Sequence, residues 1–185
     1  MRNNNRPLLS LLKCALWCTN DYLRRVRIKE SFSSLYSLFF VNQSVSATRV
    51  IKASPEKIFN LLSSPHRHTE FDGSDSIEKS LEAPDRLSLG AQFSMRVHVG
   101  VSYTITITVI DFVENTSLEW THWAKHAWRY DLKDLGDGTT SVTETWSWGR
   151  SPWFVRVGLR LVKYPQRNLA SIEKTLVKIA SIVED

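Results

Sequence analysis

The chain has 185 residues, 42% of them hydrophobic and 23% charged, a balance typical of one folded domain with its own core. Its net charge of +5 comes from residues 1–43, which hold seven Lys and Arg against two acids, whereas residues 44–185 hold 17 of each sign. A neutral body argues against a polyanion-binding surface, so we expect no nucleic-acid partner. Both cysteines, Cys14 and Cys18, lie in the first segment, which leaves the body without a disulfide or thiolate site. We therefore expect a reducing compartment, the cytoplasm.

Residues 1–43 are predicted to be a basic N-terminal extension, poorly ordered or partly helical. The apolar run at 8–17 is interrupted by Lys13 and is shorter than the roughly 20 apolar residues of a membrane span. The segment is rich in Arg and Ser and poor in acids, as organellar presequences and basic amphipathic helices are. Three alternatives therefore stay open: an organellar presequence, a basic arm that docks to anionic lipid, and upstream sequence read through from an early start site.

The body begins with a strand and two short helical segments. Residues 44–53 alternate between apolar and polar side chains and predict a strand. The run Ser54-Pro55-Glu56-Lys57 predicts a helix start, because Ser suits the N-cap and Pro suits the first helical position. A second short helical turn at 66–71 leads into a loop at 72–74. We expect the two histidines of that turn, His66 and His68, to be solvated.

Six further strands and two helices follow. Strand patterns at 75–83, 91–99 and 101–113 precede three more strands between residues 116 and 148, and Gly- and Asp-containing turns separate them. A short helix or lid is predicted at 153–162, because a proline at position 165 breaks or kinks what precedes the last helix. That last helix carries apolar residues at steps of three and four, as a helix laid across a sheet does: Leu169, Ile172, Leu176, Ile179 and Val183.

The three strands between residues 116 and 148 contain five of the seven tryptophans. A period of two, with one apolar and one polar face, predicts antiparallel strands that are covered on one side. The covered face combines large rings with two histidines and one carboxylate: Leu118, Trp120, His122, His126, Trp128, Tyr130, Leu132, Val142, Glu144, Trp146 and Trp148. Such rings suit the wall of a ligand pocket, and the alternative is that they only fill the core.

The order of one strand, two short helices, six strands and one long helix resembles the helix-grip superfamily. The resemblance rests on VIKASPEKIFNLLSSPHRHTEFDGS (50–74), on the strands at 89–97, 103–120 and 126–148, and on the last helix. This superfamily, also called SRPBCC, includes START lipid-transfer domains, Bet v 1-like proteins and the polyketide cyclase/dehydrase-like family. The resemblance implies an α+β fold for residues 44–185, in which a curved antiparallel sheet of about seven strands wraps around the C-terminal helix. It also implies a hydrophobic cavity, but no single activity.

Two functions fit these residues. The first is binding or transport of a hydrophobic small molecule or lipid, for which we expect a lining of Phe93, Met95, Tyr103, Trp120, Trp128, Tyr130, Trp146 and Trp148. The second is a cyclase- or dehydratase-type enzyme for a polyketide-like or aromatic substrate, with Glu144 and either His122 or His126 as acid and base. In the simpler alternative, Glu144 pairs with a nearby Arg or His, or reaches solvent. We expect no metal and no cofactor, because the spacing of these residues does not indicate a converging ligand set.

Overall fold

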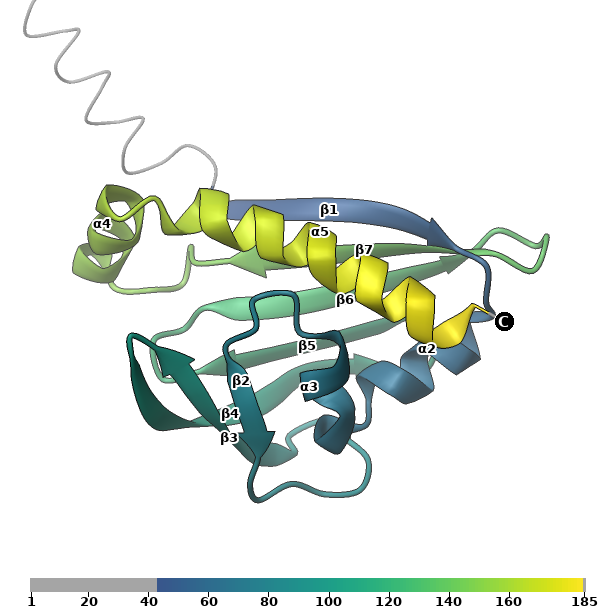
Figure 1. Ribbon diagram of the computed structural model, residues 1–185, viewed down its shortest axis with the longest axis horizontal. Helices are drawn as coiled ribbons and strands as arrows, with labels where there is room; N and C mark the ends of the chain where they lie inside the picture. The colour runs from purple at the N-terminus through teal and green to yellow at the C-terminus, as the bar shows by residue number, and fades with distance from the viewer. Residues whose placement is uncertain (1–42, 185) are drawn as a thin grey trace, which may run out of the picture. The chain divides into compact units, whose positions relative to one another are not determined.

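A computed structural model describes residues 43–184 of the chain. These residues form one antiparallel sheet of seven strands, in the order β1-β7-β6-β5-β4-β3-β2, and the long helix α5 lies across one face of it (Figure 1). The predicted α+β helix-grip fold is therefore confirmed. The predicted extension at residues 1–43 lies outside the described residues except for Gln43, so its boundary stays a prediction.

The elements follow one another in the predicted order. They are β1 (Ser44–Ile51), α2 (Pro55–Leu62), the 3₁₀ turn η1 (Pro65–Arg67), α3 (His68–Phe71), β2 (Ile77–Ser80), β3 (Gln92–Val99), β4 (Val101–Val113), β5 (Ser117–His122), β6 (Ala127–Asp134), β7 (Thr140–Ser147), α4 (Trp153–Leu161) and α5 (Tyr164–Val183). Pro165 lies in the first turn of α5, where a missing N–H costs nothing. Within residues 43–184, no helix is both long and apolar enough to span a bilayer.

The start of α2 follows from its first residues. The Ser54 hydroxyl accepts a hydrogen bond from the Lys57 amide at 3.2 Å, and Pro55 occupies the first helical position. The apolar face that follows, which includes Phe59 and Leu62, is buried against the sheet and the other helices. The cap therefore fixes where the chain leaves β1, as the sequence predicts.

The register of the central strands produces the predicted two-faced sheet. On the concave face Tyr130 lies opposite Leu118 on one side and Glu144 on the other, and Trp128 lies between Trp120 and Trp146 in the next row. Leu118, Tyr130 and Trp146 are at most 2% exposed. This row structure brings the large rings and Glu144, the acidic side chain on the concave face of these strands, under helix α5.

The loop between α3 and β2 is attached directly to α5. The Gly73 amide donates to the Thr175 hydroxyl at 3.0 Å, and the Lys178 ammonium donates to the Asp72 carbonyl at 2.6 Å and pairs with the Asp75 carboxylate at 2.7 Å. The backbone of Gly73 lies so close to α5 that an added Cβ would come within 2.5 Å of the Thr175 amide nitrogen. The loop therefore meets α5 at a fixed distance.

We predict that Gly73→Ala lowers the free energy of unfolding by about 1–3 kcal/mol, because the new methyl group overlaps the backbone of α5. Gly158→Ala is a matched control, since nothing lies within 4 Å of its Cβ position and Gly158 is in the interior of α4. Ala there should raise stability by about 0.5–1 kcal/mol through helix propensity. Urea denaturation of both variants measures the difference, and equal stabilities would contradict the close contact at Gly73.

Candidate functional site

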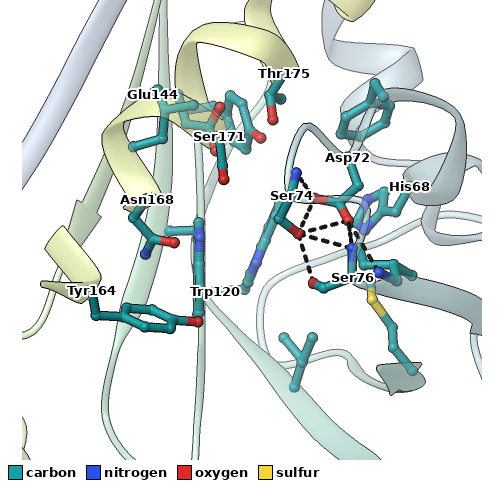
Figure 2. Close-up of a pocket in the computed structure, with 17 residues that line it drawn as sticks. His68, Asp72, Ser74, Ser76, Trp120, Glu144, Tyr164, Asn168, Ser171 and Thr175 are labelled. Atoms are coloured by element: carbon teal, nitrogen blue, oxygen red, sulfur yellow. Dashed lines mark hydrogen bonds between the residues drawn. The ribbon is translucent and has the colours of Figure 1, made fainter. Parts of the chain in front are cut away.

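A cavity of about 120 Å³ lies between α5, α3, the loop that follows α3 and the concave face of the sheet (Figure 2). A cavity of about 150 Å³ in another protein binds benzene, so the space suits one ring. Its walls combine aromatic and aliphatic side chains with hydroxyl, amide and carboxyl groups: His68, Phe71, Asp72, Ser74, Ser76, Ile77, Met95, Ile107, Trp120, Trp128, Tyr130, Glu144, Tyr164, Asn168, Ser171, Ile172 and Thr175.

The apolar wall is built around Trp120. Its indole stacks on the His68 ring at a centroid distance of 5.1 Å and lies 5.5 Å from the Tyr130 ring. Trp128 and Met95 contribute further apolar surface from β6 and β3. The cavity therefore offers flat aromatic faces to a bound molecule.

Only part of the predicted ligand-lining set lies at this cavity. Met95, Trp120, Trp128 and Tyr130 line it. Four others lie elsewhere: Phe93, Tyr103, Trp146 and Trp148. A strand residue that points inward does not necessarily line the cavity, because the helices fill part of the concave face.

The packing of these four residues explains why they do not line the cavity. Phe93 is buried and packs against His68 in a T-shaped arrangement, with ring centroids 5.6 Å apart. Trp146 and Trp148 stack on each other at 4.5 Å and fill the core, where Tyr164 covers Trp146. Tyr103 stands at the start of β4 and is 45% exposed.

Glu144 lines the cavity from β7 and is 4% exposed. Burial raises the pKa of its carboxyl group to about 8, and contact with the Tyr130 hydroxyl acts in the opposite direction. Its Oε2 atom has no hydrogen-bond partner among the described residues. The Arg or His partner expected in the simpler alternative is not there, because Arg129 lies on the opposite face of the sheet and binds Asp111 at 2.8 Å. Glu144 is therefore a neutral carboxyl group at pH 7.

Asn168 is a second buried polar group at the cavity, and sequence reasoning did not single it out. It lies on the second turn of α5, is 8% exposed, and its Nδ2 atom has no partner among the described residues. Figure 2 shows Asn168 and Tyr164 on the α5 side of the cavity. The available signal was its spacing, since Asn168 lies four residues before Ile172 and seven before Thr175, on the buried face of the helix.

His68 is buried, so the expectation that it is solvated was wrong. The ring is 2% exposed, and its Nε2–H donates to the Leu62 carbonyl at 2.8 Å. Burial lowers the pKa of His68 to about 4, which keeps the ring neutral at pH 7. The physical reason is that the short α3 turns the side chain inward onto Trp120.

His122 and His126 lie close together but do not line the cavity. Their ring centroids are 5.1 Å apart, beside Trp128 and near the start of β6. Burial, and then the neighbouring His122, lower the pKa of His126 to about 4. The structure therefore places Glu144 in the cavity and both histidines outside it. Between residues 43 and 184, no group of three or more His, Cys, Asp or Glu side chains is arranged to hold a metal ion.

Sequence comparison identifies a bacterial relative of this chain. The chain is 31% identical over 140 residues to an uncharacterized protein of Mycobacterium tuberculosis, a match that covers 74% of this chain and 62% of the relative. The chain thus spans about three fifths of the length of the curated relatives that it matches.

Two solved structures share the fold. A START superfamily protein from Mycobacterium smegmatis is 18% identical with a TM-score of 0.58, over 77% of this chain and 98% of that one. A Polyketide_cyc-like protein from Corynebacterium glutamicum is 26% identical with a TM-score of 0.53, over 77% of this chain and 91% of that one.

The family comparison covers more than half of the chain. Residues 52–161, from the end of β1 to the end of α4, match the family described as Activator of Hsp90 ATPase homolog 1-like protein. The sheet order, the long last helix and this match together identify the chain as a member of that family, within the START-like and polyketide cyclase-like (SRPBCC) superfamily.

Proposed function

We propose that this domain binds an uncharged hydrophobic small molecule with one polar group in the cavity under α5. The observation that carries the proposal is a pair of buried polar atoms without partners, Glu144 Oε2 and Asn168 Nδ2, at a cavity whose remaining wall is largely aromatic. A buried polar group without a hydrogen bond costs about 1–3 kcal/mol. A ligand oxygen that pairs with both groups removes this cost, so it binds there in preference to a purely apolar molecule.

The lining argues for a neutral ligand. A protonated Glu144 carboxyl can donate and accept a hydrogen bond, and the Asn168 amide can donate two. The lining residues include two acids, Asp72 and Glu144, and no Lys or Arg. A carboxylate or phosphate in this space would lack a counter-ion, so an alcohol, a phenol or a ketone fits better.

The volume limits how much of the ligand is enclosed. Typical ligand pockets measure about 300–1,000 Å³, whereas this one measures about 120 Å³. The enclosed part is therefore about one ring or a short chain. A lipid-sized ligand requires α5 and the loop at Gly73 to move apart, which breaks the 3.0 Å hydrogen bond between Gly73 and Thr175.

The family description names activation of the Hsp90 ATPase, which is a property of a protein partner rather than of a cavity. A cavity function is better supported by the residues that the structure describes, and we place it in the cytoplasm, as the sequence predicts. A second candidate is the cyclase- or dehydratase-type enzyme. What favours it is Glu144, because a carboxyl group with a pKa of about 8 is suited to proton transfer near neutral pH.

We predict that filling the cavity abolishes binding. Ser171 lines the cavity, and its hydroxyl donates only within its own helix, to the Arg167 carbonyl at 3.0 Å. Ser171→Phe should therefore remove any small molecule that co-purifies from the native host, as seen by native mass spectrometry, and should weaken phenol binding at least about tenfold. Ser181→Phe is the matched control, because Ser181 is exposed on the same helix and also donates only to its own helix. Equal phenol affinities for both variants would refute binding in the cavity.

Glu144→Gln separates a carrier from an enzyme. Gln keeps the shape and neutrality of the protonated carboxyl group, so phenol affinity at pH 7 should change less than about threefold. If the domain is an enzyme, turnover of the co-purified molecule should fall by about a hundredfold or more, because the transferable proton is lost. Binding is measured by calorimetry and turnover by mass spectrometry of the product. A loss of binding as large as the loss of turnover would contradict both roles of Glu144.

The shifted pKa values predict a stability maximum near pH 6.5. Glu144 has a pKa of about 8 in the folded state, above its ordinary value of 4.5, so the unfolded chain loses this proton first as the pH rises. Stability therefore falls by about 1.4 kcal/mol per pH unit between 4.5 and 8 from this group. His68 and His126 have folded pKa values of about 4, below 6.5, so each adds stability as the pH rises from 4 to 6.5.

Below pH 6.5 the two histidines outweigh Glu144, and above pH 6.5 they no longer oppose the loss of stability that comes from Glu144. Urea denaturation between pH 5 and about 8.5 should show this rise and fall, and Glu144→Gln should remove the fall above pH 6.5. A fall of the same size in the Gln variant would show that another group is responsible.

A further inference from the structure

One end of the sheet carries eight of the fifteen large hydrophobic side chains that are exposed among the described residues. The β3–β4 hairpin, the β5–β6 turn and the segment from β7 into α4 all lie at this end, because the strands are antiparallel and β3, β5 and β7 end there (Figure 1). The Ser151 hydroxyl donates to the Ala124 carbonyl at 2.8 Å and so joins the segment before α4 to the β5–β6 turn. We call this surface the sheet-end patch.

The sheet-end patch is rich in exposed aromatic and aliphatic side chains. In α4 and the residue after it, Trp153, Phe154, Leu161 and Val162 are 60–77% exposed, and no residue of α4 is buried. Trp123 in the β5–β6 turn is 79% exposed. The patch contains three more exposed side chains from the β3–β4 hairpin: Val99, Val101 and Tyr103. Soluble surfaces rarely gather so many large apolar groups, so this one is expected to meet an apolar partner.

The segment that runs from β7 through α4 into α5 is rich in basic residues, one of which, Arg150, is paired with Glu119 at 3.3 Å. Residues 145–172 contain no Asp or Glu and have five basic side chains: Arg150, Arg156, Arg160, Lys163 and Arg167. On the helical wheel of α4, Arg156 and Arg160 lie on one edge of the apolar face that Trp153 and Leu161 share. Since residues 44–185 are neutral in sum, this concentration of charge is local.

We propose that the sheet-end patch docks on an anionic lipid bilayer, with α4 lying in the plane of the interface. A short helix with exposed Trp, Phe and Leu beside Arg and Lys matches both layers of such a surface, acyl chains and anionic headgroups. A second copy of this chain would bring an equally cationic patch. Residues 1–42 hold seven basic against two acidic residues. A second copy and residues 1–42 would therefore each bring positive charge to a basic surface, so charge disfavours both as occupants of the patch.

Docking at this end would bring the cavity next to the bilayer. Tyr164 and Asn168, which line the cavity, stand on the first two turns of α5, directly after α4 and Lys163. Docking itself requires only the patch, so it can be tested whether or not the cavity binds a ligand.

The test is co-sedimentation of the full chain with lipid vesicles. Vesicles of phosphatidylcholine with about 30% phosphatidylglycerol should bind the protein at about 0.1 M salt, and pure phosphatidylcholine vesicles should bind it at least about tenfold more weakly. Raising the salt to about 0.5 M should also weaken binding, because the headgroup attraction is screened.

The variant Trp153→Ser with Phe154→Ser should lower the partition coefficient at least about tenfold, because two interfacial rings are lost. Leu89→Ser is the matched control, since Leu89 is 66% exposed in the loop before β3, away from the patch. This substitution should change the partition coefficient by less than about twofold. Leu161→Ser is a second variant, with a single substitution, and it should also lower the partition coefficient. Circular dichroism confirms that each variant is folded.

Three results would overturn the proposal. The first is no binding of the unchanged protein to anionic vesicles. The second is unchanged binding by the Trp153 and Phe154 variant, which would assign the membrane contact to residues 1–43. The third is a dimer in analytical ultracentrifugation that the same variant dissociates while vesicle binding is absent, which would make the patch an interface between copies.

Discussion

The cavity depends on the distance at which the loop containing Gly73 holds helix α5 above the sheet. The loop touches α5 through backbone, since Gly73 has no side chain and its amide binds the Thr175 hydroxyl at 3.0 Å. On its first turn, Tyr164 of the same helix rests against Trp146 of β7, with ring centroids 5.5 Å apart. Contacts at two places along its length prevent α5 from sinking onto Trp120, so the side chains between them do not fill the space completely.

The loop is itself rigid enough to act as a support. The Asp72 carboxylate accepts hydrogen bonds from the amides of Ser74 and Ser76 at 2.9 Å each and from the Ile77 amide at 3.1 Å. A carboxylate that accepts hydrogen bonds from three backbone amides of one short loop fixes the turn in one conformation. Lys178 then joins the outside of the loop to α5 through the Asp72 carbonyl. The edge of the cavity is therefore defined by polar contacts, while its floor is aromatic.

Two buried glutamates, on the two strands that flank β6, show why Glu144 is functionally informative. Glu119 is 8% exposed, but it is paired with Arg129 at 3.2 Å and Arg150 at 3.3 Å on the convex face. Glu144 is 4% exposed on the concave face and has an oxygen without a partner. The first is an ordinary compensated charge, whereas the second keeps its proton because burial disfavours its charged form and no Lys or Arg lines the cavity. An uncompensated acid at a cavity is the kind of group that a ligand or a reaction would use.

The sequence predicts the sheet, the helices and the face that each strand residue takes, because periods of two and of three to four record which side is buried. It does not predict which inward residues reach the cavity. Trp128 and Trp146 are adjacent on the same face, yet Tyr164 covers only Trp146. His68 and Asn168 were missed for a related reason: their burial comes from how α3 and α5 pack against the sheet, and local polarity carries no record of such long-range contacts.

Charge divides the two proposed activities between two parts of the domain. The sheet-end patch, which we propose to bind anionic surfaces, has five basic side chains nearby, whereas the cavity is lined by two acids and no Lys or Arg. An anionic headgroup held at α4 would therefore be disfavoured inside, and a neutral molecule dissolved in the same bilayer would be admitted. Arg167 lies over the Tyr164 ring at 6.0 Å, where the basic surface gives way to the cavity lining. In these two proposals, positive charge recognises the membrane, and hydrogen bonds to uncharged groups in the cavity select the ligand.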